Sequence, residues 1–356
     1  MPGYEVHAAK LVDVPAIRRA AEKGIILDSE MSYTRDLDIS RSAVLSSVLL
    51  PQRGLCTLVG RTDKQTVAGQ VRIKYADHLA QIVYIAPQHD AKTNSAAWLA
   101  LLDAMAQESG RRGATMLTAE VDALSPLFEI LRQTGFAVYA RQEIWRRFEP
   151  LAALPKLPAL TGVLADETDD DTLDIQLLYS NIVPRLVQPI AVPSPESAGM
   201  VYRRDGRVQA YIAVSQGKQG IYLMPFMHPD VLGREAAAII AGVMARIERN
   251  ERAPIYVCVR RYQDWLDDSL RDLGFISWAQ QAVMVRHIAA GIRQTAFALP
   301  TQAALEGIPS PITSPFHQSS LDHSTGDGSS THGTTNYRRH SRTEADSSAA
   351  SSGQTR

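Results

Sequence analysis

One short stretch of this sequence occurs twice. Leu131-Arg-Gln-Thr-Gly-Phe136 returns as Leu270-Arg-Asp-Leu-Gly-Phe275, and the same shift of 139 residues, applied without gaps, pairs Gln142 with Gln281. The repeats of solenoid proteins have periods of only ~20–50 residues, so a period of this length indicates a duplicated domain. The fold of this chain must therefore be built twice, and each copy tests the interpretation of the other.

The composition fits two domains without a strongly charged partner. The chain has 356 residues, enough for two domains of about 150 residues each, and a formal net charge of −1. A nearly neutral chain has no global field that would attract nucleic acid or an anionic membrane, so we expect neither partner. The sequence shows no signal-peptide pattern and no run of about 18 apolar residues, which predicts a cytoplasmic protein without a transmembrane helix.

A proline-punctuated segment divides the chain. Residues 1–149 form the first predicted domain, 150–158 a Pro-rich linker, and 159–293 the second predicted domain. Residues 294–356 are rich in Ser, Thr, Gly and His and poor in large apolar side chains, so we expect a disordered tail. We refer to residues 1–149 as half one and to residues 159–293 as half two.

Both halves show the same order of apolar patterns. Each has alternating strand patterns around a turn, a third strand, a long one-faced helix, another strand, and a short helix that leads into the Gly-Phe pair. In half one the expected elements are a helix at 12–22, strands at 56–60, 66–73 and 79–84, a helix at 95–111 and a strand at 115–121. In half two they are a hairpin at 201–214, a strand at 221–227, a helix at 234–249 and a strand at 254–259.

Two polar features have structural interpretations. Thr168-Asp-Asp-Asp171 has the composition of a metal site, but acids before a helix are typical of a cap that complements the positive helix end. Cys56 and Cys258 do not align under the 139-residue shift. Cys258 lies within an apolar run, so we expect a buried thiol and neither a nucleophile nor half of a disulfide.

The order of elements resembles that of the Gcn5-related N-acetyltransferase (GNAT) fold, present in tandem. The segment from Leu101 to Val121 is similar to the third helix and fifth strand of this family, and the Leu-Arg-x-x-Gly-Phe corner is similar to the end of its fourth helix. The resemblance covers about residues 1–149 and 159–293. It implies an α/β (α+β) fold: two GNAT-like acyltransferase domains, each a mixed, mostly antiparallel sheet flanked by helices.

The resemblance also implies where acetyl-CoA binds, namely at the loop before the long helix, where glycine backbone N–H groups approach the pyrophosphate. Half one has Thr93-Asn-Ser-Ala-Ala-Trp98 there, without any glycine. Half two has Leu232-Gly-Arg-Glu-Ala-Ala237, which keeps one glycine but lacks the family's Arg and adds an acidic side chain. We therefore expect the cofactor in half two, at Met227, Gly233, Arg234, Glu235, Ala236 and Ala237.

Many members of this family carry a Tyr on the short helix that protonates the departing thiolate. That position is Leu131 in half one and Leu270 in half two, and both are expected in the core. The family's Asn seven residues earlier corresponds to Leu124 and Gln263, so only half two stays polar. Tyr262 is next to Gln263 and is a candidate acid, with simple packing as the alternative.

Histidines and acids supply the other candidates. His89 and His228 are kept in register by the duplication and fall where a strand leads into the long helix. His228 is therefore a second catalytic candidate, with a structural role in the loop as the alternative. Glu120 and His78 could act as a general base, but no motif places them near other functional groups, so a surface or hairpin role is the simpler interpretation.

Two functions remain open from the sequence. In the first, the protein is a GNAT-like N-acyltransferase that moves an acetyl group from acetyl-CoA to an unknown small-molecule or peptide amine, with half two holding the cofactor and half one shaping the acceptor site. In the second, it is a catalytically inactive tandem module that keeps the fold for ligand binding or assembly. The losses in both cofactor loops favour the second, whereas the family's reliance on backbone contacts to the cofactor favours the first.

Overall fold

A computed structural model describes residues 5–35, 54–61, 65–74, 78–90, 94–149, 154–193, 197–231, 233–248 and 253–288. These residues lie in one compact unit, Met1–Arg293. The predicted tail at 294–356, the start of the linker, Thr93 and Leu232 lie outside the described residues. The domain boundaries proposed from the sequence stay a prediction.

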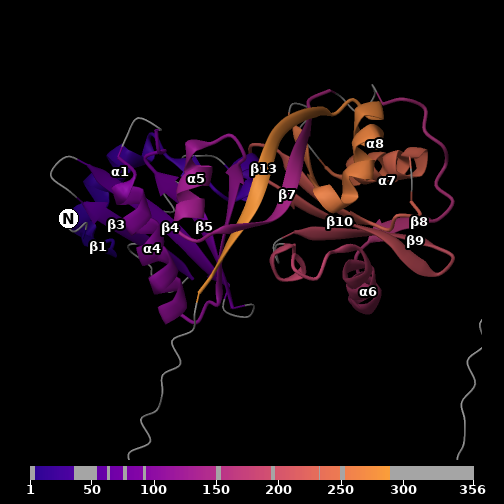
Figure 1. Ribbon diagram of the computed structural model, residues 1–356. Coiled ribbons are helices and arrows are strands. Elements are labelled where there is room, and N and C mark those ends of the chain that lie inside the picture. The colour runs from indigo at the N-terminus through magenta and orange to yellow at the C-terminus, as the bar shows by residue number, and fades with distance from the viewer. Residues whose placement is uncertain are drawn as a thin grey trace, which may run out of the picture. The chain divides into compact units, whose positions relative to one another are not determined.

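All thirteen strands of the described ranges join one sheet (Figure 1), in the order β1-β3-β4-β5-β6-β13-β7-β12-β11-β10-β9-β8, with β2 paired to β5. Neighbouring strands are antiparallel except for the two parallel pairs β5–β6 and β11–β12. The strands are β1 (Glu5–Ala8), β2 (Ile25–Ile26), β3 (Leu55–Arg61), β4 (Thr66–Lys74), β5 (Leu79–Ala86), β6 (Met116–Asp122), β7 (Ala137–Arg147), β8 (Val163–Asp166), β9 (Ala198–Arg204), β10 (Arg207–Gln216), β11 (Ile221–Met227), β12 (Ile255–Arg260) and β13 (Ile276–His287).

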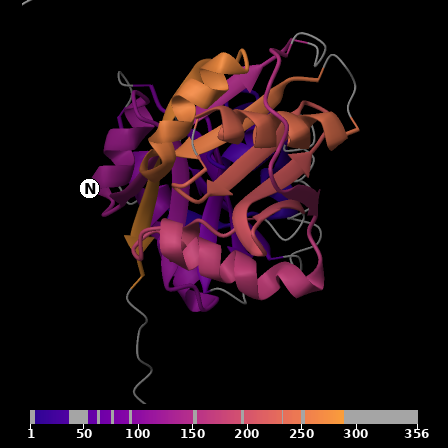
Figure 2. The same cartoon turned by 90° about the vertical axis from the view of Figure 1, so that its right-hand side faces the viewer.

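The helices occupy corresponding places in the two halves. Half one contains α1 (Val14–Ala21), α2 (Ser29–Thr34), α4 (Ala96–Arg111) and α5 (Pro126–Gln133). Half two contains α6 (Thr172–Ile182), α7 (Gly233–Arg246) and α8 (Asp267–Asp272), and Figure 2 shows α6 and α7 on opposite faces of its strands. Every strand and helix range expected from the sequence is confirmed to within a few residues. The sequence assigned no range to the other elements, among them β1, β2 and α2. None of the described helices is long and apolar enough to cross a membrane.

The last strand of each half is exchanged. Strand β7, from half one, lies between β12 and β13, while β13, from half two, lies between β7 and β6 (Figure 1). As a result Trp145 of β7 is buried in the core of half two, and Ala282 and Met284 of β13 are buried in the core of half one. Each hydrophobic core is therefore completed by the other half.

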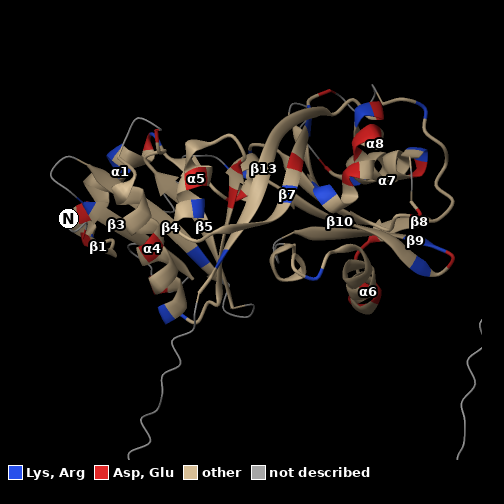
Figure 3. Cartoon of the chain, in the orientation of Figure 1, with Lys and Arg blue, Asp and Glu red and all other residues tan. Residues whose placement is uncertain are grey.

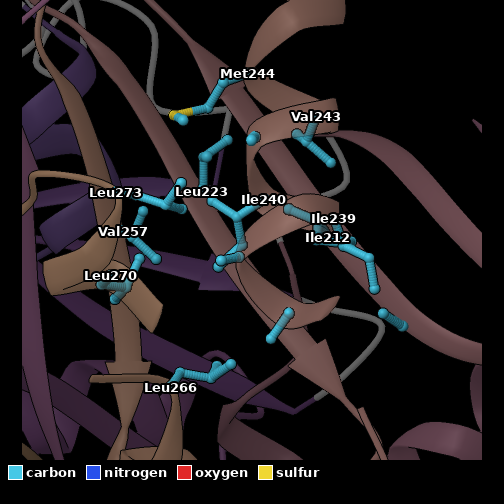
Figure 4. Close-up of a cluster of buried hydrophobic side chains, with 14 of the residues drawn as sticks. Ile212, Leu223, Ile239, Ile240, Val243, Met244, Val257, Leu266, Leu270 and Leu273 are labelled. Carbon is cyan, nitrogen blue, oxygen red and sulfur yellow. The ribbon is translucent and has the colours of Figure 1, made fainter. Parts of the chain in front are cut away.

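The repeated Gly-Phe corners hold the same positions in both cores. Leu131 and Leu270 are both fully buried, which confirms the expectation that they are core residues. Figure 4 shows Leu270 among the side chains under α7, with Leu266 and Leu273 beside it. The guanidinium of Arg147, from the exchanged strand β7, donates a hydrogen bond to the carbonyl oxygen of Leu273 and so ties half one to the corner of half two.

Helix α2 is a further connection between the halves. Its Tyr33 ring stacks on Tyr222 of β11 and Tyr256 of β12, with centroids 6.3 Å and 4.4 Å away. The Ser215 hydroxyl of β10 donates a hydrogen bond of 2.9 Å to the carboxylate of Glu30 in the same helix. Half one thus supplies a helix that packs on the sheet of half two.

Candidate functional site

The two parallel strand pairs separate as they run toward the long helices. In half two the paired residues of β11 and β12 run from Ile221 opposite Ile255 to Leu223 opposite Val257, and both strands continue beyond them. The backbone N–H and C=O groups at the end of β11 therefore have no partner on β12. Such groups need hydrogen-bond partners, because buried peptide groups are almost always satisfied.

In half two a side chain satisfies these groups. Gln263 lies at a kink within the 3₁₀ segment Arg261–Leu266 after β12 and has a non-helical backbone conformation, with φ −129° and ψ 26°. Its Oε1 accepts a hydrogen bond of 2.8 Å from the N–H of Met227, and its Nε2 donates one of 3.0 Å to the carbonyl of Pro225. Gln263 is only 1% exposed, and its side-chain amide takes the place of a peptide group of a neighbouring strand.

In half one, main chain lies between the separated ends of β5 and β6. The N–H of Leu27 donates to the carbonyl of Val83 on β5 at 2.9 Å, and the carbonyl of Leu27 accepts from the N–H of Glu120 on β6 at 3.0 Å. The preceding strand β2 pairs with β5, and the side chain of Leu27 is fully buried in the core of half one. The space between β5 and β6 is thus occupied by the backbone of Leu27, which is hydrogen-bonded to both strands.

The first turn of α4 carries a large buried side chain. Trp98 is almost completely buried and its indole N–H donates to the carbonyl of Pro87 at 3.1 Å. The buried ring of His89 packs edge-on against this indole at 4.8 Å, and its Nε2 lies 3.3 Å from the hydroxyl of Ser95. His89 therefore has the structural role that was the simpler interpretation of the sequence.

The corresponding loop of half two is open. Helix α7 begins at Gly233, which has a φ of +53°, and a side chain built there would meet no atom of the described residues within 4 Å. Ala236 and Ala237 face the core and are buried. The exposed Arg234 donates to the carbonyl of Lys156 in the linker at 3.1 Å. The first turn of a long helix is thus exposed beside the separated strands.

Glu235, the acidic residue of this loop, is engaged elsewhere. Its carboxylate accepts hydrogen bonds from Arg204 on β9 at 2.7 and 2.9 Å and from the hydroxyl of the buried Tyr202 at 2.8 Å. The ion pair with Arg204 neutralises the negative charge that the sequence places in the cofactor loop. In Figure 3 acidic and basic residues are likewise interspersed along the described chain.

The two catalytic candidates have different surroundings. His228 belongs to the turn after β11, where its Nδ1 accepts from the N–H of Asp230 at 3.3 Å. The hydroxyl of Tyr262 is buried and makes no hydrogen bond among the described residues, and burial raises its pKa to about 12. The tyrosine packs with Tyr179 of α6 on the face opposite α7. Tyr262 is therefore packed in the apolar cluster beside α6, whereas the His228 side chain is partly exposed.

A cavity of about 50 Å³ lies between the halves, and Tyr262 is not among its lining residues. Its walls include Arg260 of β12, Glu120 of β6, and Arg72 with Asp28, which form an ion pair at 3.2 Å. A second cavity, of about 360 Å³ and mostly apolar, lies beside α6. No motif in the sequence singles out Arg260 or Arg72, because each is an isolated strand residue and their meeting depends on the pairing of the two halves.

The acidic stretch before α6 is confirmed as a cap. The N–H and the hydroxyl of Thr168 both donate to the carboxylate of Asp171 at 2.7 Å, and Arg203 pairs with the same carboxylate. Cys56 and Cys258 are both buried and free, as expected for Cys258. Among the residues with described positions, no three His, Cys, Asp or Glu side chains are grouped so that they could hold a metal ion.

Comparison with solved structures establishes the fold. The structure is similar to a Gcn5-related N-acetyltransferase from Sphaerobacter thermophilus, with a TM-score of 0.52 and 12% sequence identity, over 80% of this chain and 96% of that chain. An overlap of that length spans both halves, and each half has the same order of elements. The chain has a tandem GNAT fold.

Other solved structures are similar at lower scores. They include a tandem GNAT protein from the clavulanic acid biosynthesis pathway, with a TM-score of 0.49 and 14% identity over 80% of this chain and 99% of that chain. A putative acetyltransferase from Pyrococcus horikoshii has a TM-score of 0.47 and 11% identity over 81% and 90% of the two chains. No protein-family model matches the sequence, and no curated protein matches it.

The GNAT fold implies an acyl-CoA cofactor, and the two halves fit such a molecule differently. Half one does not fit, because Leu27 occupies the strand edge with main chain and Trp98 places a large buried side chain in the first turn of α4. Half two fits at the phosphate end, where the first turn of α7 is exposed and Gly233 leaves space. At its strand edge the side chain of Gln263 holds the N–H of Met227 and the carbonyl of Pro225.

Proposed function

We propose that the protein is an acyl-CoA-dependent N-acyltransferase that holds acetyl-CoA in half two. The observation that carries this proposal is that a side chain, Gln263, binds the backbone groups at the end of β11. The N–H of Met227 and the carbonyl of Pro225 are bound by a side-chain amide, that of Gln263, and not by the main chain of another strand. The arm of coenzyme A carries amide groups of the same kind, so one amide can replace another without leaving a buried group unpaired.

The start of α7 supplies the other end of the site. The first N–H groups of an α-helix have no partner within the helix, and the helix dipole adds positive potential, so a diphosphate is favoured there. Gly233 keeps this turn free of a side chain, and Arg234 is exposed beside it. Glu235 does not oppose the phosphates with a free charge, because it is paired with Arg204.

The two halves have different roles in this proposal, because the backbone of Leu27 already lies between β5 and β6 of half one. Half one cannot receive the same cofactor arm, yet its Glu120, Asp28 and Arg72 reach the cavity on the opposite face of the half-two strands. Acetyl-CoA, when bound, supplies the activated acyl group. The residues of half one then shape the place where the amine acceptor binds.

A matched pair of substitutions tests the cofactor site. Both Asp and Asn tolerate a positive φ, so Gly233→Asp and Gly233→Asn place side chains of equal size at the start of α7. We expect acetyl-CoA to bind the wild-type chain in a calorimetric titration. Gly233→Asp should weaken binding at least tenfold relative to Gly233→Asn, because only the former adds a negative charge beside the phosphates. Equal affinities of the two variants would contradict a phosphate site there.

The alternative is a non-catalytic tandem GNAT module, and one observation favours it. Both strand gaps are closed, and the position of the family's proton donor is a buried leucine in each half, Leu131 and Leu270. Gln263→Ala separates the two functions. If Gln263 is displaced by the cofactor, its removal should tighten acetyl-CoA binding several-fold. If neither the wild type nor Gln263→Ala binds at millimolar acetyl-CoA, the non-catalytic function is the correct one.

A further inference from the structure

The cavity on the face opposite α7 contains an incompletely paired cation. Arg260 lines this cavity and is only 2% exposed. Its nearest carboxylate oxygen, Oε1 of Glu120, is 3.7 Å from Nη2. Its Nε and Nη1 make no hydrogen bond among the described residues. A buried charge without full compensation is costly, which indicates that another acceptor completes this group in the working protein.

The neighbours of Arg260 do not supply that acceptor as an anion. Burial raises the pKa of the Cys258 thiol to about 11 and that of the Tyr262 hydroxyl to about 12, so both groups are neutral near pH 7. Thiol sulfur is also a weak acceptor. A carboxylate is the ligand group that would match a guanidinium most directly, because its two oxygens accept from adjacent N–H groups.

The same cavity also offers acceptors for a positive group. Glu120 lies on the half-one side, where its Oε2 accepts from the N–H of Ser29 at 2.8 Å and its Oε1 faces Arg260. Asp28 lies in the cavity wall as well, paired with Arg72. Charges of both signs therefore line a space of about 50 Å³, which suits a small group that carries an amine and a carboxylate together.

The apolar cavity adjoins this polar one. Val192 belongs to the walls of both. The larger cavity, about 360 Å³, is lined by the rings of Tyr179, Tyr211 and Phe226. That volume falls in the range of small-molecule sites, and its walls are mostly apolar, as is typical of pockets that hold a hydrophobic side chain. Its lining residues Ile175, Leu178 and Tyr179 belong to α6. Figure 2 shows this helix on the face of the strands opposite α7.

We propose that the amine acceptor is a free α-amino acid with an aromatic or branched apolar side chain. Its carboxylate binds Arg260, its amino group lies at Glu120, and its side chain enters the neighbouring apolar cavity beside α6. This assignment rests on the proposed acyltransferase function, and it deepens that function by naming the substrate class. The residues come from both halves, so the acceptor site exists only where the two halves pair.

The test uses L-phenylalanine as the probe, in a calorimetric or NMR titration of the full chain without any cofactor. We expect binding in the millimolar range or tighter. Phenethylamine, which lacks the carboxylate, and 3-phenylpropanoate, which lacks the amine, should each bind at least tenfold more weakly. Absence of phenylalanine binding, or equal binding of phenethylamine, would overturn the proposal, and this series requires no variant to fold.

Variants then locate the carboxylate. Arg260→Lys keeps the charge but loses the planar fork, and Arg260→Gln loses both, so phenylalanine binding should fall in that order while phenethylamine binding changes little. Arg271→Gln is the control, because Arg271 is exposed on α8 and pairs with Asp268. Unchanged phenylalanine affinity in Arg260→Lys and Arg260→Gln would refute the role of Arg260. Because no acetyl-CoA is present, failure here is separate from failure of the Gly233 test.

Discussion

Gln142 and Gln281, which hold the same position in the two copies of the repeat, are hydrogen-bonded to each other. They face one another in the β7–β13 pair, and Nε2 of Gln142 donates to Oε1 of Gln281 at 2.9 Å. The hydroxyl of Ser29 donates to the same Oε1 at 2.7 Å. The duplicated sequence thus meets itself at the centre of the sheet, where the exchanged strands join the two halves.

The glutamine pair should be energetically coupled. Gln142→Ala and Gln281→Ala each remove one partner from a mostly buried network, so each should lower the free energy of unfolding by about 1–3 kcal/mol. The double variant should cost less than the sum, with a coupling of roughly 1 kcal/mol in a double-mutant cycle by urea denaturation. Gln280→Ala, at an exposed neighbouring position, is the control. Strict additivity would mean that the pair contributes no interaction.

The two halves should not fold separately. Without β13, half one loses Ala282 and Met284 from its core and exposes the edge of β6, and without β7, half two loses Trp145. Exposed edges and incomplete cores favour aggregation or disorder. We expect fragments 1–149 and 159–293 to give poorly dispersed NMR spectra alone and native-like spectra when refolded together. A cooperative unfolding transition in either isolated fragment would contradict the importance of the strand exchange.

Gln263 should stabilise the fold while it opposes the cofactor. Gln263→Ala leaves the N–H of Met227 and the carbonyl of Pro225 without their partner, which should cost about 1–3 kcal/mol in urea denaturation unless water enters. Saturating acetyl-CoA should restore part of this loss, because the cofactor binds only the folded state. A variant as stable as the wild type without cofactor would show that the two hydrogen bonds contribute little.

Leu27 should matter for stability and not for cofactor access. Its side chain is fully buried, so Leu27→Ala should lower the free energy of unfolding by about 2–5 kcal/mol. The main-chain hydrogen bonds to Val83 and Glu120 remain in this variant, so half one should stay closed. A Gly233→Asp, Leu27→Ala double variant should therefore bind acetyl-CoA no better than Gly233→Asp alone. Recovered binding would show that half one can open.

The Asp171 cap should contribute to stability in a pH-dependent way. Hydrogen bonds from Thr168 and Arg203 hold the pKa of Asp171 below its ordinary value. A carboxyl whose pKa is lower in the folded state stabilises the fold above its unfolded pKa of about 3.9, and this contribution is lost as the pH falls through the folded value. Asp171→Asn should thus lower the melting temperature at pH 7 more than at pH 3. An equal loss at both values would contradict the shift.

Local patterns were sufficient to predict most of the secondary structure. The periodicity of 95–111 and 234–249 predicted α4 and α7, and Asp205-Gly206 predicted the β9–β10 turn, where both residues have positive φ. These signals arise from neighbours a few residues apart, which is why one sequence carries them. The same repeat also placed Leu131 and Leu270 in the core, because each copy confirms the other.

The pairing of the halves depends on contacts that no local pattern contains. Strands β7 and β13 have similar sequences, so either half could in principle keep its own last strand, and the choice follows from how Trp145 and Met284 fill the opposite cores. The candidate site likewise depends partly on local sequence and partly on contacts between the halves. Gln263 stood out in the sequence as a polar residue at a family position, but its hydrogen bonds to β11 come from a backbone kink. Arg260 and Glu120 meet only because the exchanged strands bring β12 and β6 into one sheet.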